Sequence, residues 1–257
     1  MLEAVGFGFL FILGTIAIAW TAYFGMRALA ARGIEGETRD LAGSVIFRVA
    51  ALHGLILALV FAQEMLDYQQ IRSSLVEEAT AIADVYHDIR RYGADIETET
   101  KVRDALSRYV RVIVDTEWGQ LASEERLTVE GWELREIVYI AILDLVPATP
   151  RQENLRNHML DKIQRIAEFR QKRENMALHG ISGLFWFAAA VGVVLVSMPY
   201  FVFAPNTLNL VLLSMYGAFT GIAMLMIFAF SDPFSQPGRL SPSAFERLLD
   251  SEVVPDS

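Results

Sequence analysis

Four stretches of the chain are apolar over a length that can cross a lipid bilayer. A transmembrane helix takes about 20 mostly apolar residues, and the stretches of this length are 4–26, 41–63, 177–204 and 207–231. The second is the least apolar, because Arg48 lies near its start and His53 in its middle. The third carries no charge apart from the titratable His179. The pattern predicts four membrane-spanning helices, two near each end of the chain.

The residues between the second and third apolar stretches alternate between polar and apolar at helical spacing. Two stripes show this, one made of Val102, Leu106, Tyr109, Val110 and Ile113 and the other of Leu155, Met159, Ile163, Ile166 and Phe169. Such spacing is typical of amphipathic helices with one buried face. Thr149, Pro150 and Gln152 provide an N-cap, a proline at the first helical position and a capping-box partner. The pattern predicts helices over 45–92, 98–118, 129–146 and 150–203.

The predicted fold is therefore all-α, with two transmembrane helices before and two after an inserted soluble helical bundle. The bundle is formed partly by extensions of the second and third membrane helices, the last of which runs from 150 to 203 without a break. A single helix over 44–92 would be roughly 73 Å long, against a hydrocarbon core of about 30 Å. The expected parts are a first hairpin (1–64), the bundle (65–176), a second hairpin (177–231) and a C-terminal tail (232–257).

Composition narrows the function. Apolar residues make up 53% and charged residues 21%, which fits a chain divided between membrane and water. The absence of cysteine excludes disulfides and thiolate chemistry, and a net charge of −9 argues against nucleic acid as a partner. Asp84 and His87 are spaced like half of a helical di-iron motif, but the chain has no second copy. We therefore expect no enzyme, no metal site and no cofactor.

One face of the second membrane helix has the pattern of a pore wall. At 100° per residue, this face runs from His53 to Ile82, and its pore-lining candidates are His53, Leu57, Val60, Glu64 and Asp67. If several copies directed it to a common axis, Leu57 and Val60 would form an apolar constriction between polar rings. The alternative is that the face packs inside one subunit, with His53 bonded to a neighbouring helix. A histidine in mid-membrane favours a functional hypothesis but does not exclude packing.

Other polar and small residues admit structural explanations. Glu78 and Glu117 are either ion ligands or partners of Arg72, Arg108 or Arg111, and pairing is the simpler interpretation. Trp118 is expected to fill the core, and Asp232 to cap a helix or pair with an arginine. Gly217 and Gly221 have the spacing that lets membrane helices approach closely, within one subunit or between two.

Several short motifs follow one another along the chain: Tyr68 and Arg72, Val76-Glu77-Glu78-Ala79, Tyr109-Val110, Glu117-Trp118, Arg170 and Arg173, Trp186, Asp232-Pro233-Phe234, Pro242 and Phe245. In this order and spacing, they resemble the bestrophin-like domain family of bacterial membrane proteins. They cover about residues 45–248. In one departure, Ser235-Gln236-Pro237-Gly238 stands where a glycine closer to Phe234 is expected. The turn after the fourth membrane helix is therefore predicted to differ.

The resemblance implies a multi-pass protein of the bacterial inner (plasma) membrane with the layout of bestrophins, which are oligomeric anion channels. Two function hypotheses follow. In the first, the chain forms a homo-oligomeric ion channel whose second membrane helix lines the pore, with inorganic ions as its cargo. In the second, the spans anchor a sensor or scaffold whose bundle binds a ligand or protein. The acidic residues Glu64 and Asp67 make a preference for anions doubtful in the first case.

Overall fold

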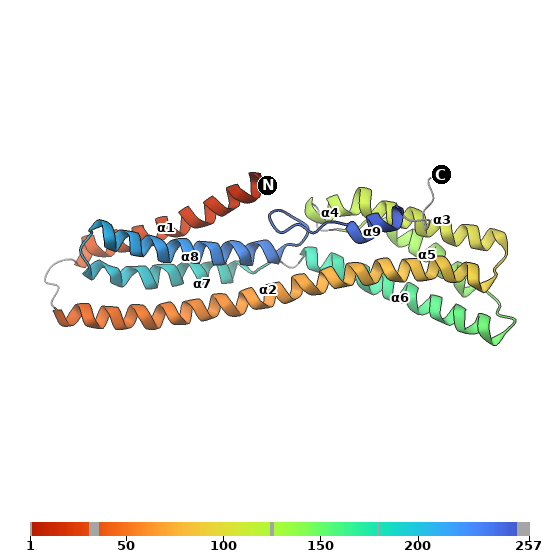
Figure 1. The fold of residues 1–257 in the computed structure, drawn as a ribbon, viewed down its shortest axis with the longest axis horizontal. Helices are drawn as coiled ribbons and strands as arrows, with labels where there is room; N and C mark the ends of the chain where they lie inside the picture. The colour runs from red at the N-terminus through yellow and green to blue at the C-terminus, as the bar shows by residue number, and fades with distance from the viewer. Residues whose placement is uncertain (1, 31–35, 124–125, 179, 251–257) are drawn as a thin grey trace. The chain divides into compact units, whose positions relative to one another are not determined.

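A computed structural model describes residues 2–30, 36–123, 126–178 and 180–250. All regular secondary structure in these residues is helical, as Figure 1 shows. The helices are α1 (Leu2–Ala30), α2 (Gly36–Tyr92), α3 (Ile96–Val112), the π-helical turn η1 (Ile113–Glu117), α4 (Trp118–Ser123), α5 (Val129–Leu143), α6 (Pro150–Leu178), α7 (Gly183–Ser197), the 3-10 turn η2 (Met198–Val202), α8 (Thr207–Ser231) and α9 (Ser243–Leu249). The all-α prediction is confirmed.

Four helices of the described chain are long and apolar enough to cross a membrane. They are those predicted from the sequence, within α1, α2, α7 with η2, and α8. The chain divides into two compact units. Unit 1 contains residues 1–67, 180–232 and 236–238, and unit 2 contains 68–179, 233–235 and 239–257. His179 and the end of the predicted tail, 251–257, lie outside the described residues.

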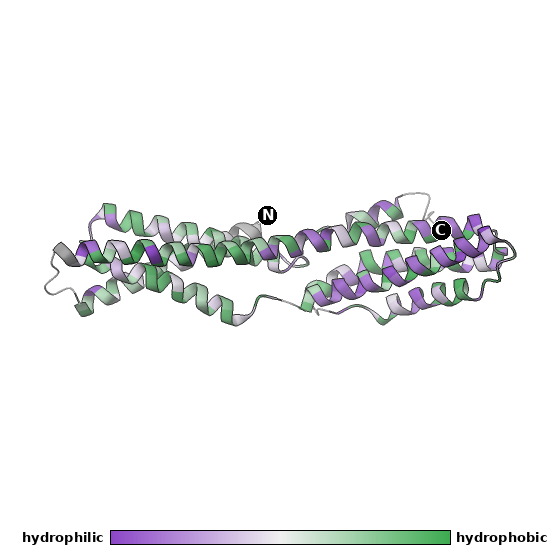
Figure 2. Cartoon of the chain, turned by 90° about the horizontal axis from the view of Figure 1, so that it is seen from below, coloured by the Kyte–Doolittle hydropathy of each residue, from purple (hydrophilic) through white to green (hydrophobic). Residues whose placement is uncertain are grey.

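α2 is continuous from Gly36 to Tyr92, so the predicted unbroken helix is confirmed. It contains no proline, and Gly54 is its last glycine. Hydrophobic residues dominate its first half and polar residues its second half, as the colours of Figure 2 show. The same helix therefore contributes a membrane segment to unit 1 and an amphipathic segment to unit 2.

The predicted single helix over 150–203 is wrong. α6 ends at Leu178, and α7 begins at Gly183. The side chain of Ser182 accepts a hydrogen bond from the backbone N–H of Phe185, which makes Ser182 the N-cap of a new helix. At the other end, Pro199 lies in the first turn of η2, where its missing N–H is tolerated. Local capping therefore outweighs the continuous apolar pattern.

Unit 1 is held together mainly by close packing of α1 on α8. A Cβ atom on Gly217 would lie 3.0 Å from the Cα atom of Ile16, and one on Gly221 would lie 2.8 Å from the Cα atom of Ile12. The hydroxyl of Thr15 donates a hydrogen bond to the carbonyl of Gly217 at 2.8 Å. The two glycines therefore bring helices together within one chain, which resolves one of the alternatives left by the sequence.

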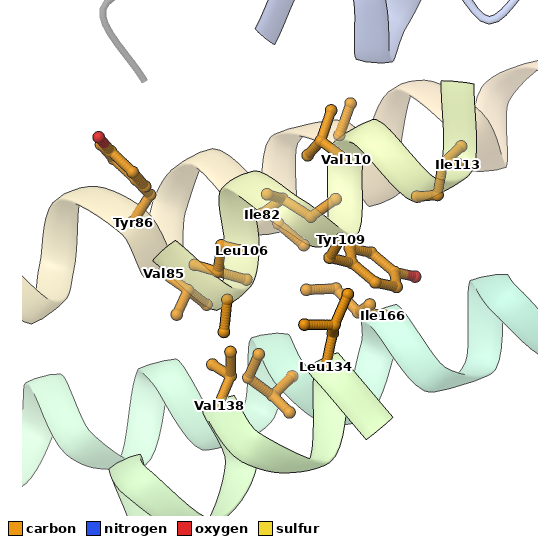
Figure 3. Close-up of a cluster of buried hydrophobic side chains, with 14 of the residues drawn as sticks. Ile82, Val85, Tyr86, Leu106, Tyr109, Val110, Ile113, Leu134, Val138 and Ile166 are labelled. Carbon is orange, nitrogen blue, oxygen red and sulfur yellow. The ribbon is translucent and has the colours of Figure 1, made fainter. Parts of the chain in front are cut away.

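Unit 2 is a bundle with one continuous apolar core. Side chains from α2, α3, α5 and α6 converge there, as Figure 3 shows for Ile82, Leu106, Val138 and Ile166. The stripes predicted on α3 and α6 supply many of these residues, including Val102 and Ile163. The C-terminal segment is also part of this unit, because Phe234 and Phe245 are fully buried in the same core. The described part of the predicted tail is therefore a packed element.

Candidate functional site

Among the described residues of unit 2, four charged side chains are fully buried: Glu78, Glu117, Arg170 and Arg173. Glu78 of α2 accepts a hydrogen bond at Oε1 from Arg173 Nη2 at 3.0 Å and another from the hydroxyl of Tyr109 at 2.7 Å. Both charged side chains of this pair have zero exposure. Removing such charges from water is costly unless they are paired. The pair therefore fixes α2 against α6, with the phenol of α3 as a third member.

The second buried pair joins η1 to α6. Arg170 donates to both carboxylate oxygens of Glu117, with Nη1 at 2.9 Å from Oε2, and Nη2 also donates to the carbonyl of Thr128 at 2.9 Å. Glu117 in turn accepts from the backbone N–H of Thr128 at 3.1 Å. Bidentate pairing of this kind is both stronger and more directional than a single ionic contact. It ties α6 to the start of α5.

A glycine makes room for Arg170. A Cβ atom on Gly131 would lie 2.6 Å from the guanidinium carbon of Arg170, closer than real side chains approach. The N–H of Gly131 donates to the hydroxyl of Thr128, which is the N-cap residue of α5. The first turn of α5 therefore combines a cap with a side-chain-free surface on which the guanidinium lies.

The predicted pairing of Glu78 and Glu117 is confirmed, but the predicted partners are wrong. Arg72 is exposed on α2, and Arg108 contacts Glu130 at 3.3 Å on the surface. Arg111 lines a surface pocket together with Arg108. The true partners, Arg170 and Arg173, are more than fifty residues away in sequence, so helix spacing alone does not identify them. The two arginines stand three residues apart on α6, and the sequence singled them out only through the family motif.

The C-terminal segment packs against Trp118 and Arg173, next to the two buried ion pairs. Trp118, which is buried as predicted, donates its indole N–H to the carbonyl of Leu240 at 3.0 Å. Its ring meets Phe234 edge-on at 5.6 Å, and Phe245 lies 5.5 Å from the guanidinium carbon of Arg173. Asp232 is the C-cap residue of α8, and Pro233, which follows it, is buried. Phe234 and Phe245, two family-motif residues of the C-terminal segment, thus pack against Trp118.

The π-helical turn determines where Glu117 points. Helical structure runs on from α3 through η1 into α4, and the extra residue of a π turn shifts the following side chains around the axis. Glu117 ends this turn and is fully buried. The sequence predicted one helix over 98–118 and gave no signal of this irregularity.

Tyr109, which donates to Glu78, stays protonated. Burial and the nearby Glu78 carboxylate raise the pKa of Tyr109, so its phenol stays a hydrogen-bond donor.

In unit 1, His53 connects α2 to two other helices. Its Nδ1 lies 3.0 Å from the hydroxyl of Tyr216 on α8. Its ring lies against α7, where a Cβ atom on Gly192 would be 2.9 Å from the imidazole Cγ. His53 is buried, so it has the environment that the packing alternative predicted.

The other pore-lining candidates lie on the same stripe of α2. Leu57 is buried with Ala189 of α7 and Met224 of α8, and Val60 packs against this cluster. Glu64 and Asp67, at the end of the stripe, are half-buried. Within one chain, the face predicted to line a pore is therefore the face that packs on α7 and α8. Much of the remaining surface of this segment of α2 is exposed, with Leu52, Leu55, Ile56 and Leu59 among its residues.

A groove opens beside this stripe. It has a volume of about 410 Å³ and lies between α2 and α8, with Ala50, Gly54, Leu57 and Ala58 on one side and Phe219, Ala223 and Met226 on the other. Nothing lies within 4 Å of the position that a Cβ atom on Gly54 would take. Among the residues that the structure describes, no group of three or more His, Cys, Asp or Glu side chains is arranged to hold a metal ion.

Comparison with solved structures shows the fold to be shared. The chain is similar to a crystal structure of a bacterial bestrophin homologue from Klebsiella pneumoniae that carries a mutation, with a TM-score of 0.67 and 11% identity over 96% of this chain and 98% of that chain. It is also similar to a crystal structure of a membrane protein variant, with a TM-score of 0.65 and 12% identity over 99% of each chain. No curated protein matches the sequence.

The model of one protein family covers nearly the whole chain. It is the Bestrophin-like domain, and it matches residues 13–245. This range includes most of the first membrane helix, the other three in full, both buried ion pairs and the C-terminal aromatic residues. The protein therefore belongs to the Bestrophin-like domain family.

Proposed function

We propose that this protein is an ion channel of the bacterial inner (plasma) membrane that assembles as a homo-oligomeric ring, with α2 lining the pore. Membership of the Bestrophin-like domain family supports a channel. The observation that carries the proposal is the asymmetric packing of α2 in unit 1. The stripe through His53 and Leu57, together with Phe61, contacts α7 and α8, whereas Leu55 and Leu59 are 56% and 63% exposed.

The pore wall in this proposal is the exposed face of α2. At 100° per residue, Leu55 and Leu59 lie on the side of the helix away from His53. Arg48, also exposed, lies on the same side nearer the start of the membrane segment. A ring of copies would place successive leucines at the axis, and an apolar constriction of this kind gates by dewetting. The predicted neck thus moves from Leu57 and Val60 to Leu55 and Leu59.

The carboxylates Glu64 and Asp67 become secondary candidates. Both are half-buried at the end of the packed stripe, where the membrane segment of α2 ends. A carboxylate at a pore mouth attracts cations through its field even when it does not face the axis directly. We propose that they affect ion preference near the mouth, and not the constriction itself.

Conductance of protein reconstituted into planar bilayers tests the proposal. We expect Leu55→Ala combined with Leu59→Ala to increase basal current, because shorter side chains ease wetting of the neck. The matched control is Leu57→Ala combined with Val60→Ala, which removes similar volume from the packed stripe. It should lower thermal stability without raising current. If the wild type and both double variants carry no current, the result would favour a membrane-anchored sensor or scaffold instead.

A further inference from the structure

The groove between α2 and α8 is elongated along both helices. One end is marked by His53 and Tyr216, and the rings of Phe61 and Phe230 pack at 5.8 Å in the direction of the other. Along the groove, residue numbers rise in the same direction on α2 and on α8. The groove therefore follows the axes of both helices. From Ala50 to Ala58 it spans about 12 Å at 1.5 Å per residue.

One wall of the groove is made of small residues. Ala50, Gly54 and Ala58 stand four residues apart on α2 and line it together. Space at Gly54 is open, as nothing lies within 4 Å of a Cβ position there. This differs from Gly217 and Gly221, whose Cβ positions are occupied by α1. Gly54 therefore does not serve helix packing within the chain.

The rest of the lining is apolar apart from three polar residues. Phe219 is 74% exposed at the rim, and Ile222, Ala223 and Met226 continue the wall on α8. The polar members are His53, Tyr216 and Thr220, of which the first two share a hydrogen bond. A ligand with a charged or strongly polar group would find few hydrogen-bond partners in this lining. The groove suits a linear hydrocarbon.

We propose that this groove is a binding site for a single hydrocarbon chain of a membrane lipid. The site lies in segments of α2 and α8 that are long and apolar enough to cross a membrane. Hydrocarbon chains are thus the surrounding medium, and the groove offers one of them contact on several sides. The bound chain would lie beside the face of α2 that we assign to the pore wall. This consequence for conduction rests on the proposed function, whereas the binding itself does not.

Photolabelling in nanodiscs tests the binding. The probe is a phospholipid with a diazirine near the middle of one acyl chain, and labelled residues are mapped by mass spectrometry. We expect groove residues such as Ala58 and Ala223 to be labelled several-fold more than Leu10 and Leu13 on the exposed face of α1. Labelling in proportion to exposure alone would overturn the proposal, since it would indicate bulk lipid only. A diazirine fatty acid as a second probe distinguishes a free acid from a phospholipid chain.

A matched pair of glycine variants completes the test. Gly54→Leu should fill the groove and reduce its labelling several-fold, whereas Gly25→Leu on α1, which also has open space at its Cβ position, should leave groove labelling unchanged. Thermal unfolding establishes that both variants fold. If Gly54→Leu changes the size of the assembly and not the labelling, the groove belongs to a subunit contact and the proposal fails. The labelling experiment does not depend on ion conduction. It can therefore support lipid binding even if the proposed channel function is refuted.

Discussion

Arg170 of α6 lies across the position that a Cβ atom on Gly131 of α5 would occupy, with its guanidinium carbon 2.6 Å from that point. The guanidinium cannot move away easily, because it donates to both oxygens of Glu117 and to the carbonyl of Thr128. The missing side chain of Gly131 thus provides the space that the buried ion pair of Arg170 and Glu117 occupies. This relationship explains a glycine in the first turn of a helix, where it weakens the helix itself.

Replacing this glycine should be costly. We expect Gly131→Ala to lower the free energy of unfolding by about 1–3 kcal/mol, the usual cost of overpacking a well-packed site. The measurement is denaturant unfolding of the purified protein followed by tryptophan fluorescence. Gly119→Ala is the control, because its Cβ position is open and alanine favours a helix by roughly 0.5–1 kcal/mol over glycine. Equal effects of the two substitutions would refute the close contact.

The buried pair of Glu78 and Arg173 should behave as a unit. Arg173→Met leaves a carboxylate buried without its partner and should cost about 3–5 kcal/mol of stability. Adding Glu78→Gln removes that charge and should restore much of the loss. Arg165→Met on the same helix breaks only a surface pair with Asp161 and should cost at most about 1 kcal/mol. Additive effects of the first two substitutions would contradict direct coupling.

The pH dependence of stability should differ in sign between two carboxylates of unit 2. Burial raises the pKa of Glu78 above its usual 4.5, against the opposing effects of Arg173 and Tyr109. The folded state therefore binds this proton more tightly than the unfolded state. Relative to the Glu78→Gln variant, the wild type should gain stability as the pH falls through the raised pKa toward 4.5.

Asp95 provides the opposite sign. It is the N-cap residue of α3, and hydrogen bonds from Thr98 lower the pKa of Asp95 below its usual 3.8. Its contribution to stability is present above pH 3.8 and is lost as the pH falls through the lowered pKa. Relative to Asp95→Asn, the wild type should therefore lose stability at that low pH. Parallel pH profiles for the two comparisons would show that burial does not govern Glu78.

The packing of His53 against α7 can be tested by substituting the glycine that it contacts. A methyl group at position 192 would meet the imidazole ring, so Gly192→Ala should displace His53 and loosen α2 from α7. We expect a lower melting temperature of the protein in detergent, with a free-energy cost of about 1–3 kcal/mol. Gly14→Ala, whose Cβ position is open, is the control. A cost that is the same in a His53→Ala background would show that the imidazole is not what the methyl group meets.

Much of the fold follows from hydrophobic pattern and length. The membrane segment over 207–231 and the uninterrupted α2 were predicted because long apolar runs and the absence of proline leave few alternatives. The break between α6 and α7 was missed, because the cap at Ser182 depends on a local hydrogen bond that the apolar pattern hides. The π turn ending at Glu117 was missed because no side-chain pattern distinguishes it from an α-helix.

The candidate site was only partly predictable. Burial of charge on Glu78 and Glu117 was anticipated as pairing, but the partners Arg170 and Arg173 come from a distant helix and depend on tertiary packing. On α2, the helical period correctly grouped His53 with Leu57 on one face. It does not say whether that face meets its own chain or a common axis, because both environments favour the same apolar residues.

The exposed face of α2 as the pore wall is the central claim, and thiol modification of single-cysteine variants tests it most directly. The chain has no cysteine, so the wild type is a clean background. We predict that a charged, membrane-impermeant thiol reagent changes the current of Leu55→Cys and Leu59→Cys channels and leaves Leu57→Cys unaffected. Modification that acts on Leu57→Cys while sparing Leu55→Cys and Leu59→Cys would place the packed stripe at the pore and contradict the account.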